Sequence, residues 1–93
     1  MKIGVPKEIK NNEFRVSLTP ASVKILVDHS HDVYVQSMAG DAIGFTDNDY
    51  LNSGAVILNS AKEVFESTTL IVKVKEPMPE EFQYINETHT LFT

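Results

Sequence analysis

Short β-branched runs alternate with helix-like segments along this chain, and that alternation restricts its possible folds more than any other feature. Lys2 to Val5 is the first such run, Val33 and Val35 mark a second, and Ala55 to Leu58 form a third. The intervals between them are too long for hairpins, which need about two to five loop residues. Strands joined by such crossovers lie parallel, so the sequence predicts the α/β class, with a mainly parallel sheet and flanking helices.

Two more runs complete the predicted sheet. A fourth strand is predicted from Thr69 to about Lys75, before Pro77 and Pro79 break the pattern, and Thr90 to Thr93 begin a fifth. No turn or polar tail follows this last apolar run. We therefore expect the fold to be incomplete here and to continue into a larger domain.

Capping signals mark where the helices begin. Thr19-Pro20 places an N-cap hydroxyl before a proline at the first helical position, where no N–H group is needed. Thr46 with Asp49, and Ser60 with Glu63, have the spacing of a capping box. Helices are therefore predicted to start after Thr19, Thr46 and Ser60.

Composition excludes several classes of function. The 93 residues are 42% apolar and 23% charged, as in one globular domain. Thirteen acidic residues against eight basic ones give a net charge of −5, which would repel a nucleic acid backbone. The absence of cysteine excludes a disulfide scaffold and a thiolate site. Because no apolar run approaches the roughly 20 residues that cross a bilayer, we expect a cytoplasmic protein with no membrane partner.

Nucleotide and metal motifs are missing. No glycine fingerprint follows the first strand, so no dinucleotide site is predicted within these residues. Gly40 and Gly44 lack a phosphate-loop lysine and indicate a loop that needs flexible φ angles. His29 and His31 form only a weak H-x-H pair at a helix end, and His89 stands alone, so no metal site is predicted.

Two lysines in the predicted fourth strand are the first candidate site. Side chains alternate along a strand, which puts Lys73 and Lys75 on one face. Open α/β sheets bind ligands at the carboxyl ends of their strands, so a lysine there can meet an anionic or carbonyl group. The alternative is an edge strand whose two solvated lysines guard against aggregation. Spacing alone does not decide between these interpretations.

Arg15 is the second candidate. It ends a polar loop that starts at Lys7, and its planar guanidinium can hold a carboxylate through two parallel hydrogen bonds. The alternative is a surface ion pair with Glu13 or Glu8. Because exposed ion pairs are abundant, the residues alone favour that alternative.

The run from Gly4 to Pro20, GVPKEIKNNEFRVSLTP, closely resembles the amino-terminal signature shared by alanine dehydrogenases and the transhydrogenase alpha subunit. Val72 to Pro77 and Leu91 to Thr93 resemble the family's next landmarks in the same order, so the resemblance covers nearly the whole chain. The run Lys10 to Glu13 is closer to the alanine dehydrogenases. Departures from the family's pattern occur at Ser17, Ser30 and Asp41-Ala42-Ile43.

The resemblance implies an NAD-dependent enzyme that interconverts L-alanine with pyruvate and ammonia. By their positions in the matching motifs, Arg15 would bind the substrate carboxylate. Lys75 would be both a substrate-binding and a catalytic residue, which bonds the carbonyl or imine region and stabilises charge there. Glu8 and Glu13 would orient these two bases rather than react.

The same resemblance implies that residues 1–93 form the amino-terminal part of a flavodoxin- or Rossmann-like substrate (catalytic) domain. NAD would be bound by a domain absent from this chain, and the catalytic histidine would follow Thr93, so His89 is not that residue. The 93 residues alone would be inactive, and the complete enzyme would be a homo-oligomer, a hexamer by family resemblance. The alternatives are the transhydrogenase alpha subunit and a stand-alone module that binds a small acid or another protein.

Overall fold

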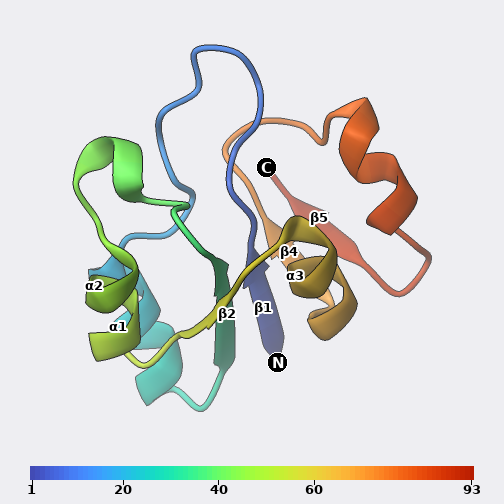
Figure 1. Ribbon diagram of the computed structural model, residues 1–93. Coiled ribbons are helices and arrows are strands. Elements are labelled where there is room, and N and C mark those ends of the chain that lie inside the picture. The colour runs from blue at the N-terminus through green and yellow to red at the C-terminus, as the bar shows by residue number, and fades with distance from the viewer.

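A computed structural model describes all 93 residues as a five-stranded sheet with helices on both faces (Figure 1). All four strand pairs are parallel, and the strand order is β3-β2-β1-β4-β5. The predicted α/β class is therefore confirmed. In chain order the elements are β1 (Lys2–Val5), α1 (Pro20–Asp28), β2 (Asp32–Gln36), the 3-10 helix η1 (Asp41–Ile43), α2 (Asp47–Asn52), β3 (Val56–Leu58), α3 (Ala61–Ser67), β4 (Leu70–Val72), the 3-10 helix η2 (Pro79–Tyr84) and β5 (Thr90–Phe92).

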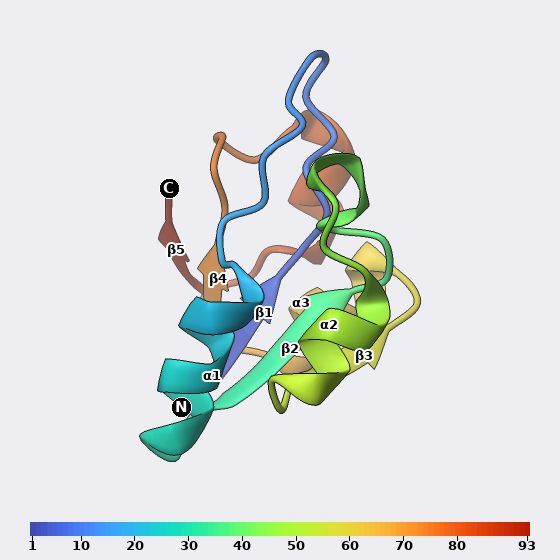
Figure 2. The same ribbon diagram turned by 90° about the vertical axis from the view of Figure 1, so that its left-hand side faces the viewer.

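The winding of the sheet reverses between β1 and β4. From β1 the chain moves outward through β2 to β3, and it then returns through α3 to place β4 on the other side of β1. Right-handed crossovers that run in opposite directions put their helices on opposite faces. Accordingly, α1 and α2 cover one face, and α3 with η2 covers the other (Figures 1 and 2).

The two faces of β1 are filled differently. Ile3 and Val5 are buried in the larger core cluster, which also contains Val33 and Val35 of β2. Gly4 points to the other face, where a Cβ atom would lie 2.5 Å from the Thr68 hydroxyl oxygen. A side chain there would push α3 away, so this glycine allows the close approach of helix to strand.

The capping signals are confirmed at all three helices. The Thr19 hydroxyl accepts from the Ser22 amide at the start of α1, and Thr46 and Asp49 form both bonds of a capping box at α2. At α3 the Ser60 hydroxyl accepts from the Glu63 amide, whereas the Glu63 carboxylate accepts from that hydroxyl instead of from the backbone. Only half of that predicted box is present.

The fourth strand is shorter than predicted. It ends at Val72. The Lys73 amide still donates to the Phe92 carbonyl of β5 at 2.9 Å, but the two amides after it, those of Val74 and Lys75, donate to the Glu8 carboxylate at 3.0 and 3.2 Å. Lys73 and Lys75 thus lie beyond the end of the strand. The prediction that strand alternation places both side chains on one face is wrong. The edge-strand alternative is wrong as well, because β4 lies between β1 and β5, and only 3% of Lys73 is exposed.

Five residues adopt left-handed backbone, and two of them bear on the predictions. Gly44 has φ 89°, which confirms the flexible φ expected there, whereas Gly40 has φ −102° and does not need that freedom. Ser30 follows the C-cap residue His29 of α1 with φ 72°. A glycine adopts this conformation without steric cost, so the serine strains the end of α1.

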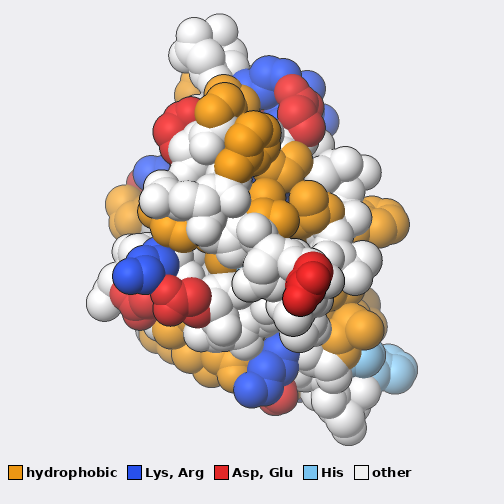
Figure 3. Space-filling view, turned by 90° about the vertical axis from the view of Figure 1, so that its right-hand side faces the viewer, with side chains coloured by type: hydrophobic (Ala, Val, Ile, Leu, Met, Phe, Trp, Pro, Cys, Tyr) orange, Lys and Arg blue, Asp and Glu red, His pale blue; other side chains and the backbone are white.

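Apolar side chains remain exposed at the β5 edge of the sheet. Phe82 of η2 is 59% exposed, and Leu91 and Phe92 of β5 are 39% and 68% exposed. Figure 3 shows hydrophobic side chains gathered on this side of the molecule. None of the helices is long and apolar enough to cross a bilayer.

Candidate functional site

Two loops rise together at the carboxyl ends of the two central strands. Residues 6–19 follow β1 and residues 73–78 follow β4, and both extend above the same edge of the sheet (Figures 1 and 2). Because the winding reverses between these strands, the connections that leave their carboxyl ends run to opposite faces of the sheet. This is the position where open α/β sheets bind ligands.

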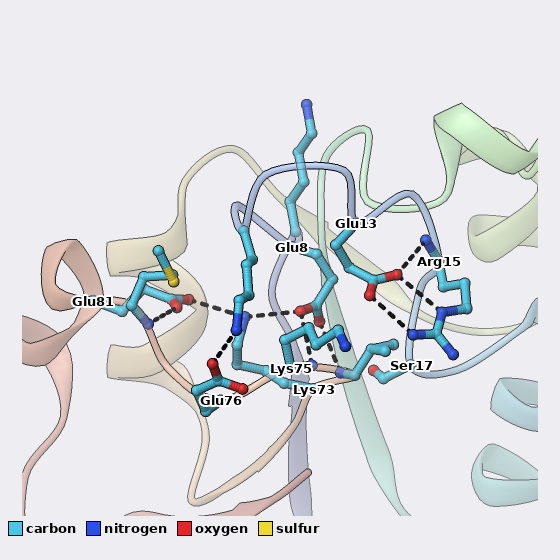
Figure 4. A network of polar contacts seen from close by, with 12 residues as sticks. Glu8, Glu13, Arg15, Ser17, Lys73, Lys75, Glu76 and Glu81 are labelled. Atoms are coloured by element: carbon cyan, nitrogen blue, oxygen red, sulfur yellow. Dashed lines mark hydrogen bonds and ion pairs between the residues drawn. The ribbon is translucent and has the colours of Figure 1, made fainter.

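The first loop presents Arg15, which is clamped by Glu13. The Glu13 carboxylate accepts from the backbone amide, Nε and Nη2 of Arg15, each at 3.0 Å (Figure 4). The ion pair between Arg15 and Glu13, which the sequence offered as the alternative to a substrate role, is thus present. It uses only two of the five N–H groups of the guanidinium, so the Nη1 side and one Nη2 donor remain free. The Arg15 side chain is 66% exposed, whereas that of Glu13 is 5% exposed.

The two charges of this pair stabilise each other. The hydrogen bond from the Arg15 side chain is the largest cause that lowers the pKa of Glu13 to about 2. The bond to Glu13 likewise raises the pKa of Arg15, and the charge of Glu8 adds to that effect. The nearby charge of Lys75 also contributes to the low pKa of Glu13.

The second loop presents Lys75. Its backbone amide is fixed by Glu8, but its ammonium group makes no hydrogen bond or ion pair, and the residue is half-buried. Glu8 comes from the loop after β1, so a single carboxylate connects the two loops. Figure 4 shows two neighbouring groups of contacts, one between Glu13 and Arg15 and one between Glu8, Lys73 and the backbone of Lys75.

Sequence reasoning missed the role of the neighbouring lysine. The Lys73 Nζ atom lies 3.3 Å from both Glu8 Oε1 and Glu81 Oε2, and all three side chains are at most 3% exposed. Lys73 stands among β-branched and aliphatic residues of a central strand end, where a lysine is rarely buried without a charged partner. The apolar neighbours of Lys73 were therefore a signal for a buried ion pair. The sequence around Lys73 did not identify Glu8 and Glu81 as its partners.

Further contacts tie the loops together at the surface and beside β4. Lys10 forms an ion pair with Glu76, which lowers the pKa of Glu76. The Ser17 hydroxyl donates to the Val72 carbonyl at 2.7 Å, exactly where β4 stops. This bond adds a link between the loop and the strand.

A small pocket of about 130 Å³ opens beside Arg15. Lys75 is not part of its wall, so the pocket extends from Arg15 toward η1 instead of joining the two bases. Besides Arg15, its lining residues are Lys7, Glu8, Glu13, Phe14, Met38, Ala39, Asp41 and Ala42.

The histidines lie outside this site. His89 precedes β5, at the opposite end of the strands from Arg15, and its ring nitrogens bond the Asn86 amide and the Phe65 carbonyl. His29 bonds the Ile25 carbonyl through Nδ1. No group of three or more histidine, aspartate or glutamate side chains is arranged to hold a metal ion.

The residues present do not fit a dinucleotide. The loop after β1 carries no glycine, and the first turn of α1 is occupied by the Thr19 hydroxyl and by Pro20, which has no N–H group. A pyrophosphate would need free amides at that helix start. The start of α1 is therefore not arranged to bind a pyrophosphate.

Comparison with known proteins agrees with this architecture. Residues 4–93 match the family described as alanine dehydrogenase/PNT, N-terminal domain. Over all 93 residues the chain is 52% identical to an alanine dehydrogenase of Methanococcus maripaludis and 47% identical to one of Bacillus subtilis. It spans about a quarter of the length of these relatives, 25% and 24%.

Solved structures give the same result. An L-alanine dehydrogenase is 48% identical and superposes with a TM-score of 0.94 over 98% of this chain and 25% of its own. A transhydrogenase from Sinorhizobium meliloti is 26% identical, with a TM-score of 0.89 over 98% of this chain and 27% of its own. Taken with the five-stranded parallel sheet, these matches show that the chain belongs to the alanine dehydrogenase/PNT N-terminal domain family.

Proposed function

We propose that these residues are the amino-terminal part of the substrate domain of an alanine dehydrogenase. The complete protein would interconvert L-alanine with pyruvate and ammonia. Identities of 52% and 48% with alanine dehydrogenases, against 26% with a transhydrogenase, support this choice within the family. The exposed apolar β5 edge supports a domain in which further structure packs against these residues.

In this proposal Arg15 binds the substrate carboxylate. Glu13 holds the Nε and Nη2 side of the guanidinium, so the Nη1 and Nη2 edge faces outward and is preset for two parallel hydrogen bonds. Fixing the guanidinium before substrate arrives lowers the entropic cost of binding.

Lys75 acts on the other end of the same molecule. Its unpaired ammonium can donate to the substrate carbonyl oxygen and stabilise the negative charge that develops on that oxygen when ammonia adds to the carbonyl carbon. The single observation that carries the proposal is that a preset guanidinium edge and a free ammonium stand on two adjacent loops, which the Glu8 carboxylate joins.

The hydride would be exchanged with NAD, which this chain does not hold. We propose that a separate domain binds it and that residues 1–93 alone have no turnover. The complete protein is also proposed to be a cytoplasmic homo-oligomer, with the hexamer as the expected form.

Turnover measurements test this proposal. The complete protein should form NADH from L-alanine and NAD and consume NADH with pyruvate and ammonia, while the purified 93-residue chain should do neither. Hydride exchange between two nucleotides without alanine turnover would instead identify a transhydrogenase. Alanine turnover by the 93-residue chain would contradict the proposed division of roles.

A further inference from the structure

The buried group formed by Glu8, Lys73 and Glu81, here called the buried triad, has no part in the chemistry proposed above. Each of its side chains is at most 3% exposed, yet the three come from distant parts of the sequence: the loop after β1, the end of β4 and η2. Burying charged groups is costly unless they are paired and hydrogen-bonded. Such a cost points to a specific structural purpose.

The two carboxylates of the triad bind backbone amides of one segment. Glu8 accepts from the amides of Val74 and Lys75, and Glu81 Oε1 accepts from the amide of Met78 at 2.9 Å. The loop after β4 is therefore folded around two buried acceptors. This fixes the path of the backbone from residue 73 to residue 78.

The Lys73 ammonium contacts both of these carboxylates. It donates to Glu8 Oε1 at 3.3 Å, the same oxygen that accepts from the Lys75 amide. The contact with Glu81 Oε2 is also 3.3 Å, but it meets only the ion-pair distance, because that oxygen has no hydrogen-bond donor. Glu8 is thus the principal partner of Lys73, and Glu81 the weaker one.

We propose that Lys73 is a positioning residue for Lys75, acting through Glu8. Lys73 holds the Glu8 carboxylate in place, Glu8 holds the amides at the bend, and the bend aims the free ammonium of Lys75 at the substrate. The inference rests on the catalytic role proposed for Lys75. The buried Lys73 would thus position the loop, and the half-buried Lys75 would contact the substrate.

A double-mutant cycle in the complete protein tests this proposal. Lys73→Met keeps the length of the side chain and removes the ammonium, and it should lower kcat/KM for pyruvate at least about tenfold, because a displacement of about 1 Å can cost up to about 10²-fold. In a Lys75→Ala background the same change should lower kcat/KM less than about twofold, since the ammonium that Lys73 positions is already absent. Higher enzyme concentrations keep the residual rate measurable.

The cycle separates positioning from a simple loss of folded protein. A smaller folded fraction would lower the rate by the same factor in both backgrounds, and that result would overturn the proposal, as would an unchanged rate for Lys73→Met alone. If Lys75→Ala alone retains full activity, it is the proposed function that fails. Lys62→Met, on the exposed face of α3 where Lys62 pairs with Glu66 at 3.9 Å, is the matched control and should leave the rate unchanged.

Leaving two carboxylates buried without a cation can prevent folding. If Lys73→Met does not fold, Glu8→Gln replaces it in the same cycle. Glutamine keeps the size of Glu8 but offers one acceptor oxygen in place of two. The expected result is again a fall that disappears in the Lys75→Ala background, and an equal fall in both backgrounds overturns the proposal.

Discussion

Replacing Arg15 by alanine in the complete protein should remove the two hydrogen bonds that hold the substrate carboxylate. Glu13 occupies one side of the guanidinium, which leaves an edge that donates two parallel bonds. Hydrogen bonds to charged groups contribute about 1.5–3 kcal/mol, and the two bonds of one guanidinium edge act as a unit whose contributions do not add in full. We therefore expect Arg15→Ala to lower kcat/KM for pyruvate by about 2 kcal/mol or more, which is roughly a 30-fold loss.

The assay compares two ketones. Steady-state reduction of pyruvate is measured beside that of pyruvamide, which keeps the carbonyl group but replaces the carboxylate with a neutral amide. The unaltered protein should strongly prefer pyruvate, and Arg15→Ala should lose most of that preference because the discriminating cation is gone. Lys24→Ala removes a cation from an exposed pair with Asp28 on α1 and serves as the control.

Either of two results would refute the proposed role of Arg15. An Arg15→Ala protein of unchanged efficiency would show that the guanidinium serves only its ion pair with Glu13. An equal loss for pyruvate and pyruvamide would show that Arg15 supports the fold of the loop without contacting the carboxylate.

Three further predictions concern stability of the 93-residue chain, measured by urea unfolding. Gly4→Ala should destabilise it by about 1–3 kcal/mol, because the new methyl group meets the Thr68 hydroxyl oxygen at 2.5 Å; an unchanged midpoint would contradict the close approach of α3. Ser30→Gly should stabilise it by roughly 0.5–1 kcal/mol, since glycine relieves the left-handed strain at φ 72°, and a loss of stability would count against that strain. The pKa of Glu13 is lowered from 4.5 to about 2 in the folded chain, so its contribution is complete above pH 4.5 and disappears as the pH falls toward about 2. Across that window Glu13→Gln should lose less stability than the unaltered chain, and an equal loss would show that the ion pair does not control this titration.

Features determined by nearby residues were predictable from the sequence. The starts of α1, α2 and α3 follow from a hydroxyl that reaches an amide three residues away, as at Thr19, Thr46 and Ser60. The parallel sheet follows from the spacing of the apolar runs. The capping signals depend on contacts within one turn and the sheet prediction on the lengths of the connections, so both can be recognised before the chain is folded.

Features determined by distant residues were not predictable. The end of β4 depends on Glu8, which lies 66 positions before Val74 in the sequence and removes its amide from the strand ladder. The burial of Lys73 depends on the same carboxylate and on Glu81 of η2. For Arg15 the sequence offered an ion pair or a substrate role as alternatives, whereas the geometry allows the same guanidinium to serve both.

The most direct test of a shared site is a crystal structure of the complete protein with bound pyruvate. The pyruvate carboxylate should accept from Nη1 and Nη2 of Arg15, with Glu13 still on the Nε side, and the ketone oxygen should lie within about 2.7–3.2 Å of the Lys75 ammonium. Pyruvate bound away from the carboxyl ends of β1 and β4, or in contact with only one of the two bases, would contradict the account.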